Sequence, residues 1–381
     1  MNKGPTAVSI DQQARFVVGG EPFFPIGLYS VPHEESFAEL RRAGFNVVHS
    51  YEFSRTLYLN PQSRERAIKE FDGLGDAAAA QYLKTAADHD LLVLMTFNRP
   101  QGSSQEVFSA KGREQMSQRI VALREQPALL AWYVADEPDG QEFAPEWVCE
   151  NRQLAESLDT AHPTMSCLCV PSRFGEYAQT SEVLMYDPYP VCREPLSVVG
   201  GNHTRLKKIV GPARATIGVI QAFDWRSYSW MHLDTRPPTL QELRCMTYQA
   251  IVGGVSGVFY FCYDNELHSN RAAANPEGWL SLAAVAHELQ TLMPALLAPP
   301  SRSVGWEGEI QACARVVGEE TWVLAVNPNA ESCEATFTLP AEAAKATVLN
   351  CFDSPAHLAV QDSWRMDFEP YGVRALRVRS A

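Results

Sequence analysis

The sequence predicts an α/β protein: a (β/α)8 TIM barrel followed by a small C-terminal antiparallel β-sandwich. Short apolar runs alternate with helical patterns as far as residue 298, which is typical of a parallel sheet. The length of 381 residues suits a barrel of roughly 250 residues with a smaller companion. After Pro300 the pattern changes to short alternating runs separated by turn residues. We therefore expect a barrel with an N-terminal β-hairpin in residues 1–298 and a β-sandwich in residues 299–381.

Each predicted strand is an apolar run bounded by turn residues, and each predicted helix carries apolar residues at helical spacing. The N-terminal hairpin is expected at 14–18 and 22–24, around two glycines. The barrel strands are expected at 24–29, 45–50, 91–97, 129–135, 164–170, 183–187, 215–221 and 257–263. The helices are expected at 34–44, 76–88, 115–124, 145–158, 205–210, 240–252 and 280–297. The sandwich strands are expected at 310–316, 321–327, 335–339, 346–350, 364–368 and 373–378.

The composition excludes several classes of partner. A net charge of -13 and the lack of a basic run argue against nucleic acid, which requires a basic surface. No segment is apolar for long enough to span a membrane. The nine cysteines are scattered without metal-ligand spacing, so we expect reduced thiols and no structural zinc site. A metal site at His49, Asp187 and Asp264 stays open, but nothing in their spacing favours it, and we expect neither a metal nor a cofactor.

The first fifteen residues show no signal-peptide pattern, so the chain as written is expected to be cytoplasmic. A signal peptide removed beforehand would make it secreted or periplasmic instead. The sequence leaves open whether the protein forms a homo-oligomer.

Two adjacent carboxylates follow the fourth predicted strand. The run 129–135 leads directly into Asp136, Glu137 and a proline. In a parallel barrel the carboxyl ends of the strands carry the catalytic groups, and charges at such a position are not needed for packing. Strict alternation places Glu137 on the face of Tyr133 and Ala135, toward the mouth of the barrel, and turns Asp136 toward the helices. The alternative is a helix-capping Asp-Glu-Pro loop without chemistry.

Six segments carry a resemblance that covers nearly the whole chain. They are 18–27 at the entry to the first strand, 43–48, 187–190, 254–261, 325–328 and 369–373. In this order they resemble the retaining glycoside hydrolases of clan A, which are built on a β/α barrel and often carry an accessory sandwich. The resemblance implies hydrolysis of a glycosidic bond in an oligosaccharide, polysaccharide or glycoconjugate. It assigns the general acid/base role to Glu137, at a position that follows an asparagine in most members; here the preceding residue is Asp136.

The second catalytic group departs from this pattern. Clan A enzymes use a glutamate at the end of the seventh strand as the nucleophile, and the matching residue here is Gln221. Another carboxylate could serve, the candidates being Asp187, Asp224 and Asp264. The consecutive Asp136-Glu137 pair also resembles hexosaminidases in which the substrate's own acetamido group attacks. The alternative from another class is a non-catalytic carbohydrate-binding barrel.

A sugar site needs flat aromatic faces beside hydrogen-bonding groups, and several strand ends supply them. Most of these residues could instead simply pack in the core or in loops, His49 especially. The candidate substrate-binding residues are Tyr29, His49, Tyr51, Asn98, Asp187, Tyr189, Gln221, Trp225, Tyr263 and Asp264.

Overall fold

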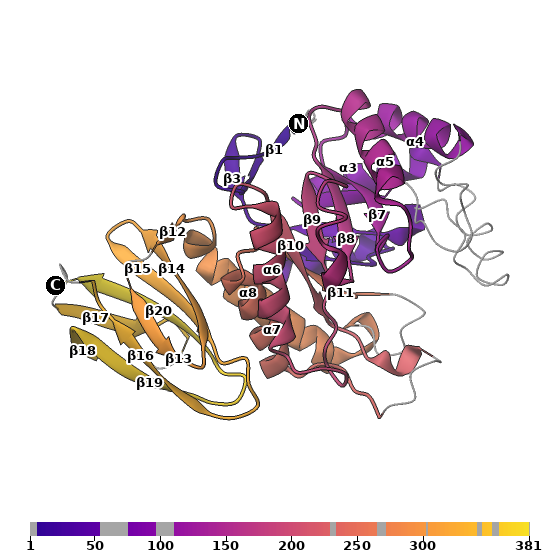
Figure 1. Cartoon of the computed structure of the whole chain (residues 1–381). Helices are drawn as coiled ribbons and strands as arrows, with labels where there is room; N and C mark the ends of the chain where they lie inside the picture. Colours follow the sequence, from indigo (N-terminus) through magenta and orange to yellow (C-terminus); the bar gives the residue numbers. More distant parts are fainter. Residues whose placement is uncertain are drawn as a thin grey trace.

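The computed structural model describes residues 6–53, 75–96, 110–228, 234–264, 272–301, 304–340, 345–352 and 358–380. Eight parallel strands form a closed barrel in chain order, with β11 pairing back to β4 (Figure 1). The predicted barrel is therefore confirmed. Its strands are β4 (Ile26–Leu28), β5 (Val47–His49), β6 (Leu92–Thr96), β7 (Leu129–Asp136), β8 (Thr164–Leu168), β9 (Val183–Tyr186), β10 (Thr216–Gln221) and β11 (Val258–Phe261).

The helices pack around this barrel, and three of them match their predicted bounds: α3 (Asp76–Asp88), α5 (Pro145–Leu158) and α7 (Leu240–Val252). The others are α1 (Phe37–Arg42), α4 (Ala110–Leu123), α6 (Val198–Val210) and α8 (Pro276–Leu296). Helix α6 starts seven residues before the predicted 205, because its two glycines do not break it. Gly200 instead allows close approach, since a Cβ at this position would lie 2.0 Å from the side-chain oxygen of Gln311.

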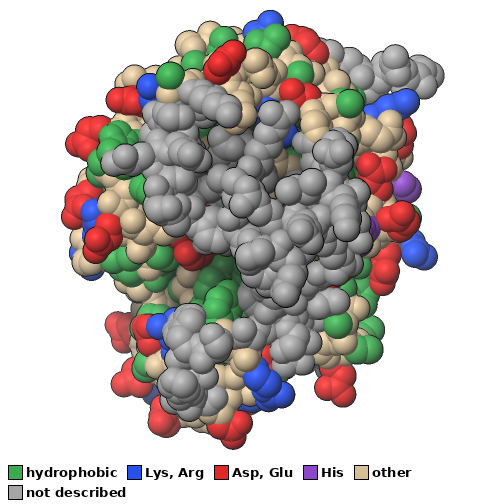
Figure 2. Space-filling model, turned by 90° about the vertical axis from the view of Figure 1, so that its right-hand side faces the viewer, with side chains coloured by type: hydrophobic (Ala, Val, Ile, Leu, Met, Phe, Trp, Pro, Cys, Tyr) green, Lys and Arg blue, Asp and Glu red, His purple; other side chains and the backbone are tan. Residues whose placement is uncertain are grey.

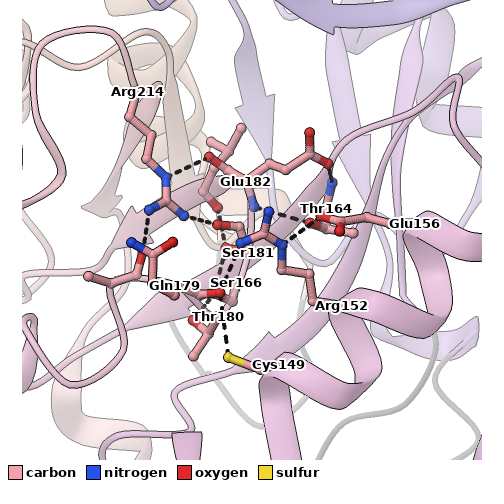
Figure 3. Close-up of polar contacts among 12 residues, drawn as sticks. Cys149, Arg152, Glu156, Thr164, Ser166, Gln179, Thr180, Ser181, Glu182 and Arg214 are labelled. Atoms are coloured by element: carbon pink, nitrogen blue, oxygen red, sulfur yellow. Dashed lines mark hydrogen bonds and ion pairs between the residues drawn. The ribbon is translucent and has the colours of Figure 1, made fainter. Parts of the chain in front are cut away.

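The connection from β8 to β9 contains no α-helix, in agreement with the helices expected from the sequence, none of which lies between these two strands. It has only the 3₁₀ helix η3 (Pro171–Arg173), followed by turns. A polar network holds this connection against its neighbours (Figure 3). Arg214 donates hydrogen bonds to three backbone carbonyls of the connection, and Arg152 of α5 donates to a fourth at 2.9 Å. The four acceptors are the carbonyls of Ala178, Gln179, Ser181 and Glu182.

Two apolar layers position the barrel. Inward-facing side chains such as Val47, Met165 and Val219 fill its interior, so the barrel is a packed core and not a pore. Side chains on the outer strand faces pack against the helices. A three-stranded sheet of β1 (Val8–Ile10), β2 (Phe16–Val18) and β3 (Glu21–Phe23) adds to the inner layer, where the sequence predicts a two-stranded hairpin.

Nine strands follow the barrel in one antiparallel order, β12-β14-β15-β20-β17-β18-β19-β16-β13. The order folds over at the tight β18–β19 turn, and the two layers enclose a separate core that contains Val323 and Phe337. The predicted β-sandwich is therefore confirmed, with three short strands added. Its strands are β12 (Pro300–Ser301), β13 (Gly305–Gly308), β14 (Gln311–Val317), β15 (Glu320–Val326), β16 (Cys333–Thr338), β17 (Lys345–Asn350), β18 (Leu358–Gln361), β19 (Ser363–Phe368) and β20 (Val373–Ser380).

The sandwich packs directly on the barrel. Trp322 and Leu324 of β15 belong to the same apolar cluster as the buried residues of α7 and α8. Strand β12 begins four residues after α8 ends. Among the described residues, no helix combines the length and the apolar character needed to cross a membrane.

Candidate active site

A β-bulge near the end of β7 reverses the predicted orientation of Asp136. Between Tyr133 and Ala135 the pairing with β8 skips one residue, so Val134 is an extra residue in the strand. Val134 and Ala135 both pack in the outer layer, and Asp136 returns to the interior, where its carboxylate contacts Tyr133. The prediction that Asp136 faces the helices is therefore wrong, because one inserted residue moves every later side chain to the other face.

Glu137 turns toward Asp187 through a left-handed backbone conformation, with φ of 46°. Its N–H donates to the carbonyl of Cys167 on β8 at 3.0 Å, which fixes the backbone at the end of β7. Its carboxyl is hydrogen-bonded to the carboxyl of Asp187, the residue that follows β9. Glu137 and Asp187, here called the acid pair, therefore join the carboxyl ends of the fourth and sixth barrel strands.

The acid pair places two titratable groups in a partly dry environment. Asp187 is 7% exposed, and its burial together with the negative charge of Glu137 raises the pKa of Asp187 well above its usual value. Its Oδ1 atom is buried and has no hydrogen-bond partner among the described residues, which a neutral carboxyl tolerates better than a carboxylate. Glu137 is more exposed than Asp187. The arrangement can store one proton on Asp187 and pass it outward through Glu137.

Asp139, which sequence reasoning missed, holds the loop that carries Glu137. It is 1% exposed, and its carboxylate accepts hydrogen bonds from the N–H groups of Cys169 at 3.1 Å and Val170 at 2.7 Å. Burial raises the pKa of Asp139, although these hydrogen bonds oppose that effect. The loop after β7 is thus tied to the end of β8. A carboxylate three residues after Asp136 is the only sequence signal that could have indicated this role.

Tyr29 directly follows β4 and is 1% exposed. Its hydroxyl donates to that of Tyr133 at 3.2 Å, and the Tyr133 hydroxyl donates to the Asp136 carboxylate at 2.6 Å. Burial and nearby acidic groups raise the pKa of both tyrosines well above 10. Tyr29 therefore supports the interior of the site and does not present a surface for a sugar, which corrects its prediction as a substrate contact.

His49 is fully buried and serves the same interior layer. Its Nε2 atom is 2.8 Å from the hydroxyl of Thr96, and its ring packs between the rings of Tyr29 and Tyr51. The packing alternative therefore describes His49 better than a substrate contact does. Tyr51 is only partly buried, at the end of β5, and remains a candidate sugar contact.

Tyr189 and Trp225 form an aromatic group beside the acid pair. Tyr189 is partly exposed, and burial together with the charge of Asp187 raises its pKa well above 10. Trp225 is only 5% exposed, and the guanidinium of Arg193 lies 4.6 Å from its ring centroid. The prediction of Trp225 as an open sugar platform is therefore wrong, because Arg193 covers a face of its ring. Tyr189 is the more accessible aromatic surface.

Gln221 is fully buried at the end of β10. Its side-chain oxygen accepts from the N–H of Val191 at 2.9 Å, and its amide nitrogen donates to the carbonyl of Phe223 at 3.2 Å. An amide can both accept from the Val191 N–H and donate to the Phe223 carbonyl. A carboxylate has no proton to donate, so one of its oxygens would face the oxygen of that carbonyl. Gln221 thus links two backbone segments, which corrects its prediction as a substrate contact.

The remaining predicted residues lie in different surroundings. Asp224 is fully buried and accepts hydrogen bonds from Arg226 and Thr235, so it holds its own loop. Tyr263 packs in the outer layer, against Trp279, and its prediction as a substrate contact is wrong for that reason. Asp264 is partly exposed after β11, and its N–H donates to the carbonyl of Ser30. Asn98 lies outside the described residues.

Figure 2 shows one face of the molecule, turned by 90° about the vertical axis from the view of Figure 1, and acidic side chains are frequent around the outline of this face. Within the described ranges, no cluster of three or more His, Cys, Asp and Glu side chains is arranged to hold a metal ion.

The fold is shared with glycoside hydrolases of several families. A family 5 glycoside hydrolase from Bacteroides vulgatus superposes with a TM-score of 0.66 at 13% identity, covering 98% of this chain and 93% of that one. A family 42 β-galactosidase from G. stearothermophilus gives 0.62 at 9% identity, covering 94% and 98%. A family 30 endoxylanase from Clostridium papyrosolvens gives 0.52 at 11% identity, covering 99% and 100%. No protein-family model matches the sequence, and no curated protein does.

Proposed function

We propose that this protein is a glycoside hydrolase in which Glu137 is the general acid/base. The observation that carries the proposal is the acid pair, a partly exposed glutamate hydrogen-bonded to a buried aspartate at the carboxyl ends of two barrel strands. Glycosidic cleavage requires a carboxylic acid that protonates the leaving oxygen. The shared fold with glycoside hydrolases of several families supports the same activity.

Asp187 serves as the proton partner of Glu137 and not as the nucleophile. Nucleophile and acid/base are about 5–5.5 Å apart in retaining enzymes, and the two carboxyls are about 6.5–9.5 Å apart in inverting enzymes. The Asp187 carboxyl interacts directly with that of Glu137, an arrangement that suits the sharing of a proton better than either of these roles. The buried Asp187 instead keeps one proton on the pair toward neutral pH, because both carboxyls cannot readily ionise side by side.

The attacking group then comes from the substrate, a 2-acetamido sugar. Its acetamido oxygen attacks the anomeric carbon while Glu137 donates a proton to the leaving oxygen, and the glycosidic bond breaks. Asp136 accepts a hydrogen bond from the acetamido N–H, which becomes positively charged in the cyclic oxazolinium intermediate. Water then adds to the anomeric carbon as Glu137 removes its proton, and the acetamido group is restored. The bulge that turns Asp136 inward and the buried amide of Gln221 both favour this sequence of steps.

Glu137→Gln tests the assignment. We expect kcat/KM on an aryl 2-acetamido glycoside with a poor leaving group to fall by roughly 10²- to 10⁴-fold, because proton transfer is lost. Glu142→Gln, an exposed change in the same loop, is the matched control and should retain full activity. Retention of wild-type turnover by Glu137→Gln would contradict the role of Glu137.

Two further measurements separate the remaining options. Asp187→Asn should move the alkaline limb of the pH–rate profile to lower pH, because Glu137 then lacks the buried partner that keeps one proton on the pair toward neutral pH. A panel of nitrophenyl glycosides should show turnover of 2-acetamido sugars and much slower turnover of their 2-hydroxyl counterparts. Binding of these sugars with no turnover of any would favour the non-catalytic carbohydrate-binding barrel instead.

A further inference from the structure

We propose that Tyr133 is a positioning residue that aims the Asp136 carboxylate at the substrate, and that Tyr29 holds Tyr133 in place. The proposal rests on the proposed function, because it assigns how the carboxylate beside Glu137 is oriented for its task. Neither tyrosine touches the substrate. Both act from inside the barrel, through the hydroxyl chain that ends on Asp136.

The geometry is that of a directed hydrogen-bond chain. The Tyr133 hydroxyl donates its proton to Oδ1 of Asp136 at 2.6 Å, a short distance typical of a hydroxyl bonded to a charged acceptor. With its proton used in this way, Tyr133 accepts from the Tyr29 hydroxyl at 3.2 Å. The Tyr29 hydroxyl also lies 3.5 Å from the sulfur of Met185. Tyr29 therefore donates to Tyr133, and Tyr133 donates to Asp136.

Burial makes this chain rigid and fixes its direction. The tyrosines are each 1% exposed, and their rings lie edge to face with centroids 6.1 Å apart. The packed interior leaves them little rotational freedom. Because their pKa values are raised well above 10, both hydroxyls stay protonated donors at any working pH. Oδ1 of Asp136 is thus held by a fixed donor.

The chain adds to what the β-bulge does. The bulge brings Asp136 to the inner face, and the Tyr133 hydroxyl then binds its Oδ1 atom directly. A hydrogen bond from the rigid interior selects one orientation, which is the support that a precise site requires. Glu137 needs no such bond, because its carboxyl is paired with Asp187.

The test is a double-mutant cycle of Tyr133→Phe with Asp136→Asn on an aryl 2-acetamido glycoside. Tyr133→Phe should lower kcat by about tenfold and change KM by less than about threefold, because orientation matters most as the acetamido group attacks. It should also weaken binding of a thiazoline analogue of the cyclic intermediate by about tenfold, and binding of the N-acetylated product much less. In the Asp136→Asn background, Tyr133→Phe should add almost nothing, since the tyrosine acts through Asp136.

Two controls keep the outcome decisive. Tyr260→Phe removes a buried hydroxyl that is 3.1 Å from that of Thr247 in the outer layer, and should leave kcat and thiazoline binding unchanged. Tyr29→Phe keeps the bond between Tyr133 and Asp136, so it should give a smaller loss in the same direction, about two- to fivefold. It also tests the proposal if Tyr133→Phe does not fold.

The outcomes are distinguishable. Additive effects in the cycle, or a Tyr133→Phe variant that behaves like Tyr260→Phe, would overturn the positioning role while the glycosidase assignment stands. A wild-type protein that neither hydrolyses 2-acetamido glycosides nor binds the thiazoline would overturn both.

Discussion

Replacing His203 by leucine should remove a large part of the protein's sensitivity to acid. His203 lies on α6 with 1% of its surface exposed, and its ring packs edge to face on Tyr186 with centroids 5.2 Å apart. Gly218 and Gly253 leave the space that the side chain fills, since a Cβ on either would lie within 3.2 Å of it. Neither ring nitrogen has a hydrogen-bond partner. Burial without a partner lowers the pKa of His203 to about 3.

The sign and the size of the effect follow from this shift. In the unfolded chain His203 takes up a proton near pH 6.5, whereas in the folded protein it stays neutral until the pH approaches about 3. The unfolded state therefore binds more protons between these values, and folding stability falls as the pH falls. Well below pH 6.5 the loss is about 1.4 kcal/mol per pH unit, and between pH 7.5 and pH 4.5 it totals roughly 2.7 kcal/mol.

The assay is urea unfolding of the wild type and of His203→Leu at pH 7.5 and pH 4.5. Other groups titrate in this range as well, so the quantity that matters is the difference in unfolding free energy between the two proteins. That difference should change in favour of leucine by roughly 2.7 kcal/mol on acidification. Val199→Ala, a cavity control in the same helix, should shift stability equally at both pH values. A His203→Leu difference that is also independent of pH would refute the reasoning.

Two further predictions concern stability. Gln221→Glu should destabilise the fold by roughly 2–4 kcal/mol at pH 8, because a buried carboxylate would replace the donor to the Phe223 carbonyl, and it should not create a nucleophile. Thermal unfolding measures the loss of stability. A variant as stable as the wild type would contradict the structural role of Gln221. Arg214→Ala should cost roughly 2–4 kcal/mol in urea unfolding, because it removes the donor of three backbone carbonyls in the β8–β9 connection. Arg205→Ala, an exposed change on α6, should change stability little and serves as the control for Arg214.

The barrel and the sandwich were predictable because both depend on hydrophobic periodicity, which the sequence displays directly. Each barrel strand is buried on two faces and reads as a continuous apolar run. The position of Glu137 at a strand end was predictable on the same basis. The start of α6 was not, since a glycine pair reads as a break unless the close approach of Gln311 to Gly200 is known.

The contacts within the site depend on details that periodicity does not encode. Nothing in the side chain of Val134 indicates that it is an extra residue, yet it decides which way Asp136 points. Gln221 is an amide at a strand end, and only the tertiary structure shows that both of its polar atoms bind backbone. The partnership of Glu137 with Asp187 joins residues fifty positions apart, at the ends of two barrel strands, β7 and β9, that are separated by β8.

The three carboxylates of the site differ in environment, and the difference assigns their tasks. Asp187 is buried with an unsatisfied oxygen and a charged neighbour, so the neutral form is favoured there. Asp136 accepts a hydrogen bond from the Tyr133 hydroxyl, which in turn accepts one from Tyr29, and this fixed arrangement suits a carboxylate that must accept from a substrate N–H. Glu137 is partly exposed whereas Asp187 is buried, so a proton from Asp187 should reach the substrate through Glu137. Neighbouring titratable groups in different environments can take separate acid and base roles. In this site the proton should therefore move from Asp187 to Glu137 and from Glu137 to the leaving group.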